Sequence, residues 1–299
     1  MELPKLCLGT AQFSGNYGIS NRHRQMRHQR AKSIIQTAIG EGIFRFETAR
    51  VYGKGEEILG ESTAHFQKRM IIAKTPVISA DFVTHYDKES FKEACYLSLE
   101  KFKADSIEAL LVHHGHNILL PGGDNLVEAL KELKREKVIR KLGVSVYSQK
   151  EIEEILRVFV PDLIQLPFNA ADRRLEKSGC LSKLKSLGVE VHARSIFLQG
   201  LLLMDINEIP IRFGKMIPEI RKFQERAFSQ GYTLIEACLS QVLKLKEIDV
   251  LLFGVNTPSE LVEITECYRR VVKKVGFKGF EFSSELGEEI LDPRKWETI

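Results

Sequence analysis

The sequence lacks the features that mark a membrane-spanning, secreted or nucleic-acid-binding protein. No apolar run approaches the roughly 18 residues of a transmembrane helix, and no signal-peptide core follows Met1. A net charge of +4 is too small to indicate nucleic-acid binding by itself. We therefore expect no membrane partner, no nucleic-acid partner, and a cytoplasmic protein that is a monomer or a weak homo-oligomer.

Cysteine-rich and glycine-rich motifs are also missing. The five cysteines are scattered and show no CxxC spacing, which fits a reduced protein better than a disulfide frame or a zinc site. The run His113–His116 holds three histidines, but adjacent side chains of a strand point to opposite faces, so we predict no metal site. Gly53–Gly55 lacks the third glycine of a Rossmann fingerprint and follows the second strand signal rather than the first.

What the sequence does contain is a repeated alternation of short apolar runs and amphipathic stretches. The strand candidates are Leu6–Leu8, Phe44–Phe46, Met70–Ala73, Ala109–Val112, Leu142–Val144, Leu163–Leu166, Val189–His192 and Val250–Phe253. The helix candidates are Ala31–Gly40, Glu56–Phe66, Lys88–Phe102, Leu126–Lys137, Gln149–Phe159, Arg174–Leu187, Leu234–Lys244 and Pro258–Val271. Strands and helices that alternate in this way predict parallel βαβ units.

Two folds accommodate such units, an open doubly wound sheet and a closed barrel. The count of eight strand signals and the missing glycine-rich turn after the first strand favour the barrel. A chain of 299 residues suits one such barrel, which usually has about 250 residues or more. We therefore predict an α/β protein, a (β/α)8 TIM barrel that forms a single domain over residues 1–299. Residues 272–299 are expected as a C-terminal extension packed on the barrel.

Ionisable residues follow three consecutive strand candidates, where a barrel carries its chemistry. Glu47 and then Tyr52 follow the second strand, Lys74 follows the third, and His113 follows the fourth. A lone lysine or histidine after a strand is usually a solvated or structural residue. Four such residues that converge on one rim are much less easily explained by chance, so we predict that they form a catalytic cluster.

The chemistry of this cluster is that of a general acid. A tyrosine hydroxyl has an ordinary pKa of about 10, and a buried ammonium such as that of Lys74 is expected to lower it. The carboxylate of Glu47 would hold the ammonium in place, and the imidazole of His113 could orient a carbonyl group. Together they could protonate a developing alkoxide.

Several segments, in their order along the chain, resemble the aldo-keto reductase superfamily. They are Gly9-Thr10-Ala11, Phe46–Gly53 with Glu57 and Leu59-Gly60, Ala73-Lys74-Thr75, Leu110–His113, Gly143-Val144-Ser145, Gln165 with Asn169, and Ser195 with Leu198–Gly200. Each segment is a weak signal alone, but their order from about residue 8 to residue 261 is specific.

The resemblance implies a role for each matching residue. Tyr52 would be the proton donor, Lys74 would tune it, His113 would position the substrate carbonyl, and Glu47 stands at the place of the family's aspartate. The expected cofactor is NADP or NAD, bound across the barrel mouth without a Rossmann motif. The residues expected to bind it are Gly9, Thr10, Ala11, Glu47, Ser145, Gln165, Ser195, Phe197, Gly200, Gly254, Asn256 and Thr257.

Three departures from the family pattern bear on these expectations. Glu47 is one methylene longer than aspartate, and a misplacement of about 1 Å can cost about 100-fold in rate. Val146 stands where asparagine is common, which removes one amide contact to the nicotinamide. Asn256, Glu260 and Ile264 replace basic and amide residues often used for the adenosine end. Family habit favours NADP, whereas the acidic Glu260 disfavours its 2′-phosphate, and on balance we expect NADP.

An arginine cluster in the first loop after a strand, Asn21–Arg30, suggests a further expectation. Arg24 and Arg27 would bind an anionic substrate such as a sugar phosphate, because arginine binds phosphate in a bidentate manner. The alternative is a solvated loop that leads into the first helix. The sequence leaves both interpretations open.

The favoured function is NAD(P)H-dependent reduction of an aldehyde or ketone to an alcohol, with a small carbonyl compound as the substrate. The first alternative is cofactor-linked isomerisation or epimerisation of a sugar without net reduction. The second is a regulatory subunit that keeps the cofactor as a ligand and has lost most of its redox activity.

Overall fold

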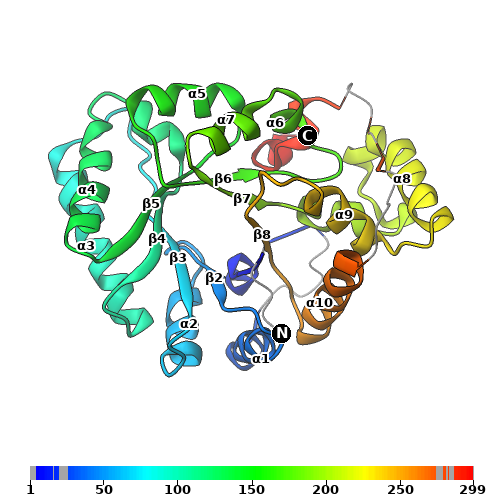
Figure 1. Ribbon diagram of the computed structural model, residues 1–299, viewed down its shortest axis with the longest axis horizontal. Coiled ribbons are helices and arrows are strands. Elements are labelled where there is room, and N and C mark those ends of the chain that lie inside the picture. The colour runs from blue at the N-terminus through cyan, green and yellow to red at the C-terminus, as the bar shows by residue number, and fades with distance from the viewer. Residues whose placement is uncertain are drawn as a thin grey trace.

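Eight parallel strands form a closed barrel in sequence order, from β1 through β8 and back to β1 (Figure 1). The computed structural model describes residues 5–15, 17–19, 26–273, 279–280, 282 and 286–298. The strands are β1 (Leu6–Gly9), β2 (Arg45–Glu47), β3 (Met70–Lys74), β4 (Ile107–Val112), β5 (Ile139–Ser145), β6 (Leu163–Pro167), β7 (Glu190–Arg194) and β8 (Val250–Phe253). The predicted barrel is therefore confirmed.

Side chains along each strand alternate between the barrel interior and the layer under the helices, as the pleat of a strand requires. The interior is filled by Cys7, Ile72, Ala109, Leu111, Leu163, Val250 and Leu252. Their immediate neighbours, such as Leu8, Ala73 and Leu110, belong instead to the larger core beneath the helices. Continued to the carboxyl ends, this alternation makes Glu47 and Lys74 inward-facing positions.

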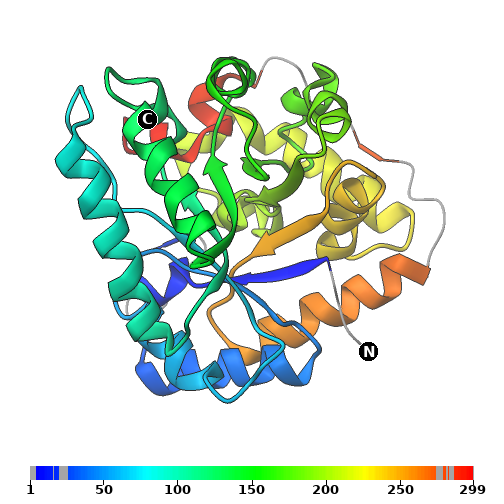
Figure 2. The ribbon, with the colours of Figure 1, turned by 60° about the vertical axis from the view of Figure 1, so that its left-hand side comes forward.

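Helices surround the barrel and bury one face each against it. The longer ones are α1 (His28–Gly40), α2 (Gly55–Thr63), α3 (His85–Phe102), α4 (Asp124–Arg135), α5 (Gln149–Val158), α8 (Ile217–Ser229), α9 (Leu234–Leu243) and α10 (Pro258–Lys273). Thr84 and Asp87 form a capping box that starts α3, and Ser148 caps α5 by accepting from the backbone of Glu151. α10 lies beside α1, which closes the helical layer (Figure 2).

The sequence missed the structure between β6 and α9. The single helix expected over Arg174–Leu187 is two helices, α6 (Arg174–Lys177) and α7 (Cys180–Ser186), because Gly179 lies between them at φ 74°. After β7 the chain runs through three short 3-10 helices, η3 (Leu198–Leu203), η4 (Ile206–Glu208) and η5 (Ile211–Met216), before α8. Such short turns lack the 3.6-residue periodicity that would reveal them.

The floor of the barrel carries a charged layer that the apolar strand pattern did not reveal. His192 Nε2 lies 2.7 Å from Glu190 Oε1, and Lys141 Nζ lies 2.6 Å from the other oxygen of that carboxylate. Burial alone would raise the pKa of Glu190, but His192 and Lys141 lower it to about 2. Burial lowers the pKa of His192. The layer therefore pairs a carboxylate with a neutral imidazole and an ammonium.

The described part of the C-terminal segment contacts the body of the barrel. It contains α11 (Glu288–Leu291) and η6 (Pro293–Thr298). Trp296 is 4% exposed, packs edge-on against Phe213 with ring centres 4.7 Å apart, and donates to the Ile290 carbonyl. The aromatic residues of this segment therefore serve as packing anchors. Within the described ranges, no helix is both long enough and apolar enough to cross a bilayer.

Candidate active site

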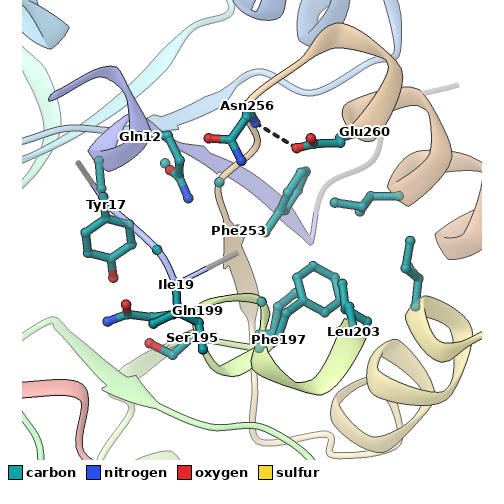
Figure 3. Close-up of a pocket in the computed structure, with 18 of the residues that line it drawn as sticks. Gln12, Tyr17, Ile19, Ser195, Phe197, Gln199, Leu203, Phe253, Asn256 and Glu260 are labelled. Carbon is teal, nitrogen blue, oxygen red and sulfur yellow. Dashed lines mark hydrogen bonds between the residues drawn. The ribbon is translucent and has the colours of Figure 1, made fainter. Parts of the chain in front are cut away.

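A cavity of about 900 Å³ opens at the carboxyl ends of the strands. Glu47, Tyr52 and Lys74 line one part of it. Figure 3 shows another part, where Phe197 and Leu203 face Asn256 and Glu260 across the cavity. One cavity therefore joins members of the predicted catalytic cluster to residues expected at the adenosine end of a dinucleotide.

The core of the site is a chain of contacts from Glu47 through Lys74 to Tyr52. The Glu47 carboxylate forms an ion pair with the Lys74 ammonium, and their side chains are only 3% and 4% exposed. Lys74 Nζ donates to the Tyr52 hydroxyl over 3.1 Å. Burial alone would lower the pKa of Lys74, but the Glu47 carboxylate and the Tyr52 hydroxyl raise it. The ammonium is therefore held in its charged form beside the phenol.

The net effect on Tyr52 differs from the sequence prediction. Burial and the nearby Glu47 carboxylate raise the pKa of Tyr52 to about 12, although the Lys74 ammonium opposes them. The expected direction of the lysine's influence is correct, but the expected net lowering of the pKa is wrong. The reason is that a phenolate in this site would lose its hydration and face a carboxylate. Tyr52 therefore holds its proton across the neutral range.

His113 lies next to this chain of contacts. Its ring is edge-on to the ring of Tyr52, with centres 6.2 Å apart. Burial and the Lys74 ammonium lower the pKa of His113 to about 3, so the imidazole is neutral. Within the described ranges its Nδ1 has no hydrogen-bond partner. A neutral imidazole with an unused ring nitrogen can hydrogen-bond to a carbonyl oxygen without adding charge.

Ser145 and Gln165 are paired in register at the carboxyl ends of β5 and β6. Ser145 is 3% exposed and Gln165 is fully buried. In the described part of the chain, neither amide atom of Gln165 has a hydrogen-bond partner. A buried amide left without partners costs about 1–3 kcal/mol. Neither residue is among those that line the cavity, so an amide group of a ligand could supply the missing partners only by reaching past the cavity wall.

The loop after β7 has an unusual backbone. Ser195, Leu198 and Gln199 have φ values of 58°, 48° and 53°, and Gly200 follows at 93°. A residue other than glycine in this region costs on the order of 1–3 kcal/mol, and such residues cluster at functional sites. Fully buried Leu198 anchors this loop, and the Asn169 amide donates to the Ser195 carbonyl over 3.2 Å. Successive amides in such a conformation form a concave site for anions.

The opposite part of the cavity lies where β8 leads into α10. Gly254 and Asn256 line it, whereas Thr257 does not; its hydroxyl accepts from the backbone of Glu260 over 3.2 Å. The Glu260 carboxylate turns back and accepts from the Asn256 backbone over 2.8 Å (Figure 3). A carboxylate of the protein therefore occupies the start of α10, where an anionic ligand would otherwise be favoured.

The remaining predicted residues divide into those at the cavity and those away from it. Gly9, Ala11, Ser195, Phe197 and Gly200 line the cavity. Thr10 does not: its buried hydroxyl donates to that of Thr48 over 2.8 Å. Arg27 is exposed at the start of α1 and is not among the lining residues. Arg24 lies outside the described residues.

Sequence reasoning missed part of the cavity wall. Gln12 and Tyr17 come from the loop after β1. Leu203 and Phe228 come from the segment between β7 and α9. The signal that could have located this wall is length, because a long insertion at the carboxyl face of a barrel is usually functional.

Comparison with known proteins agrees with this geometry. The sequence model of the aldo/keto reductase family matches residues 5–278. The chain belongs to the aldo/keto reductase family. Its relatives include the uncharacterized oxidoreductase YqkF of Bacillus subtilis, 32% identical over 203 residues that cover 65% of each chain. An NADH-specific methylglyoxal reductase of Escherichia coli is 23% identical over 254 residues, which cover 74% of this chain and 77% of the relative.

The fold of this aldo/keto reductase also resembles solved structures. An aldo-keto reductase from Bacillus halodurans superimposes with a TM-score of 0.72 at 20% identity, covering 96% of this chain and 90% of that one. At that identity the likeness concerns the fold. It agrees with the closed barrel described above.

Proposed function

We propose that this protein reduces an aldehyde or ketone to an alcohol with NAD(P)H, and that Tyr52 is the proton donor. One observation carries the proposal: the Tyr52 hydroxyl accepts a 3.1 Å hydrogen bond from Lys74 at the wall of the large cavity. A partly buried phenol whose oxygen faces an ammonium is suited to give up a proton during the reaction and not before it.

The protonation state of each catalytic group follows from the direction of its pKa shift. Because its pKa is raised to about 12 by burial and Glu47, Tyr52 carries its proton when a substrate arrives. The proton passes from the Tyr52 oxygen to the carbonyl oxygen, and the Lys74 ammonium stabilises the phenolate that remains. A ring N–H of His113 donates a hydrogen bond to the same oxygen and fixes its direction. Glu47 keeps Lys74 charged throughout.

The cofactor is proposed to lie along the cavity. A bound nicotinamide supplies the hydride that the carbonyl carbon receives. Ser145 and Gln165 would hold its carboxamide, since the Gln165 amide is buried without a partner in the described part of the chain. The backbone amides of the loop that contains Ser195 and Gly200 would face the pyrophosphate. Asn256 would face the adenosine end, where its buried Oδ1 has no hydrogen-bond partner among the described residues.

The charges along the cavity favour NADH over NADPH. Asp205, Glu208, Glu260 and Glu263 all line the cavity, and the only cationic side chains among the described lining residues are those of Lys74 and Arg194. A 2′-phosphate adds about two negative charges at a place where this chain offers carboxylates. We therefore propose NADH as the preferred cofactor, which is the specificity named for the methylglyoxal reductase relative.

The decisive experiment measures the loss of NADH absorbance with a panel of small aldehydes and ketones, together with NADH binding by fluorescence. Tyr52→Phe should lower kcat by about 100- to 10,000-fold while NADH still binds. Tyr86→Phe is the matched control, because Tyr86 is 80% exposed on α3 and does not line the cavity. NADH binding without turnover of any carbonyl, in the wild type and in Tyr52→Phe alike, would contradict the proposal and favour a regulatory role.

A further inference from the structure

Arg194 occupies an inward-facing position at the carboxyl end of β7. His192, two residues earlier on the same strand, is 2% exposed inside the barrel, and Arg194 continues its alternation into the cavity. Its backbone is paired with Pro167 at the end of β6. The Arg194 side chain is partly buried, and it lines the same cavity as Tyr52 and Lys74.

The guanidinium of Arg194 has unused hydrogen-bonding capacity. It offers five N–H donors, and among the described residues one of its nitrogens donates to the Val146 carbonyl over 3.1 Å. In the described part of the chain, no carboxylate lies within 4.0 Å of it. Three other arginines, after β6 and in the C-terminal segment, differ because each has a carboxylate partner. Their pairs are Arg173 with Glu176, Arg174 with Asp172, and Arg294 with Asp292.

An aromatic ring holds Arg194 in position. Its guanidinium carbon lies 4.0 Å from the centre of the Tyr147 ring. The guanidinium carbon of Arg294, in the C-terminal segment, lies 3.4 Å from the same ring centre. Stacking of this kind fixes the plane of a guanidinium while leaving its edge free to bind an anion. An anion beside Arg194 would also offset the repulsion between the two cations.

The positive charge of Arg194 acts on the histidines beside the catalytic cluster. Burial lowers the pKa of His113, and Lys74, His114 and Arg194 add to that effect. Burial also lowers the pKa of His114, with contributions from Arg294, Lys74 and Arg194. These influences fall off with distance, so Arg194 lies near His113 and His114.

We propose that Arg194 forms an anion-binding subsite that recognises a carboxylate or phosphate group on the carbonyl substrate. The inference rests on the proposed carbonyl reduction and names its substrate class: short aldehydes or ketones that carry a negative charge. Arg194 thereby takes the role that the sequence suggested for Arg24 and Arg27. Tyr147 positions the Arg194 guanidinium.

The test compares charged and neutral substrates of similar size. The pairs are glyceraldehyde 3-phosphate with glyceraldehyde, and succinate semialdehyde with butanal. The wild type should have a higher kcat/KM for the anionic member of at least one pair. A preference in the first pair indicates a phosphate site, and a preference in the second indicates a carboxylate site. In Arg194→Gln the anionic-to-neutral ratio should fall by about 10- to 100-fold. Arg194→Lys should recover part of it through its point charge.

Two further measurements separate this inference from its alternatives. Arg140→Gln is the control, since its side chain is 73% exposed near the start of β5, at the other end of the barrel, and the ratio should not change. Calorimetric titration with glycerol 3-phosphate and glycerol measures anion binding without turnover. If the wild type binds glycerol 3-phosphate more tightly than glycerol, and Arg194→Gln loses this difference, the subsite is supported even if no carbonyl is reduced.

Three results would overturn the inference. The first is a wild type that shows no preference for either anionic substrate and no affinity for glycerol 3-phosphate. The second is an Arg194→Gln variant whose ratio and affinity are unchanged. The third is a variant that loses NADH affinity while keeping its ratio, because Arg194 would then serve the cofactor.

Discussion

The Glu47 carboxylate and the Lys74 ammonium form an ion pair that is almost completely buried, with side-chain exposures of 3% and 4%. Gly9 lies beside this pair. A Cβ at position 9 would come within 3.3 Å of Glu47 Oε2 and 3.2 Å of the Leu252 side chain. A side chain at position 9 would therefore crowd the Glu47 carboxylate, and Gly9 keeps the space beside the ion pair clear.

This relationship leads to a prediction for the charge and length of residue 47. Glu47→Asp keeps the charge and shortens the side chain, and we expect kcat/KM for carbonyl reduction to stay within about 3-fold of the wild type or to rise. Glu47→Gln keeps the length and removes the charge. We expect this variant to lose about 3–5 kcal/mol of stability, because an ammonium is left buried without its partner. A collapse of activity in Glu47→Asp would mean that the site depends on the longer acid.

The pH dependence of reduction should be simple. Burial and Glu47 raise the pKa of Tyr52 to about 12, and burial and Lys74 lower that of His113 to about 3. Neither group changes its protonation between pH 5 and pH 9, so kcat should show no inflection from either of them in that range. Initial rates at saturating cofactor measure this. An inflection near pH 6.5 that disappears in His113→Gln would contradict a neutral His113.

The acidic start of α10 makes a prediction about the cofactor. We expect the wild type to bind NADH at least about 10-fold more tightly than NADPH, because a phosphate beside Glu260 meets like charge. Glu260→Gln should narrow this difference, because removal of the negative charge raises the affinity for NADPH. Glutamine can still accept from the Asn256 backbone, so the start of α10 should keep its structure. Fluorescence titration gives both dissociation constants. The control is Glu266→Gln, on the same helix, 59% exposed and away from the cavity.

Equal affinities for the two cofactors, unchanged in Glu260→Gln, would show that these carboxylates do not select the cofactor. A higher affinity for NADPH than for NADH would instead support the preference for NADP that family habit suggests.

Much of the catalytic cluster could be predicted from the sequence, because strand ends are local features. Lys74 and His113 directly follow apolar runs, and parallel strands bring such ends to one rim. The net pKa of Tyr52 could not be predicted, because it depends on how far the site is buried. Arg194 could be located by counting two residues on from His192, but its lack of a carboxylate partner within the described ranges depends on the packing of residues distant in sequence. The cavity wall between β7 and α9 has no periodicity to reveal it.

Gly60 belongs to a segment that resembles the family signature, and the structure shows why a side chain does not fit there. A Cβ at Gly60 would lie 1.9 Å from the Lys101 carbonyl oxygen, where α2 crosses the end of α3. We expect Gly60→Ala to destabilise the protein by about 3 kcal/mol, because backbone must move to make room. Gly40→Ala is the control: a Cβ there meets nothing within 4 Å, and the helical position should gain about 0.5–1 kcal/mol. Chemical denaturation measures both, and equal effects would contradict the close approach.

The charged floor of the barrel predicts a loss of stability in acid. Burial alone would raise the pKa of Glu190, yet His192 and Lys141 lower it to about 2, whereas an unfolded glutamate titrates near about 4.3. A depressed acid pKa contributes stability that is present above the unfolded value and is lost as the pH falls from there toward 2. Burial also lowers the pKa of His192. As the pH falls below about 6.5, His192 is protonated in the unfolded chain before it is protonated in the folded one, and this also lowers the stability of the fold.

Glu190→Gln isolates the carboxylate part of this effect. The Glu190 side chain is 23% exposed, so solvent screens the interaction, and we expect the variant to lose about 1 kcal/mol at pH 7. Its stability should then fall less steeply than that of the wild type between pH 5 and pH 3, because glutamine does not titrate. Urea unfolding at a series of pH values measures the slopes. Glu154→Gln, on the outer face of α5 with a 3.9 Å contact to Lys150, should run parallel to the wild type. If the Glu190→Gln curve also ran parallel, the floor would not be the origin of the acid sensitivity.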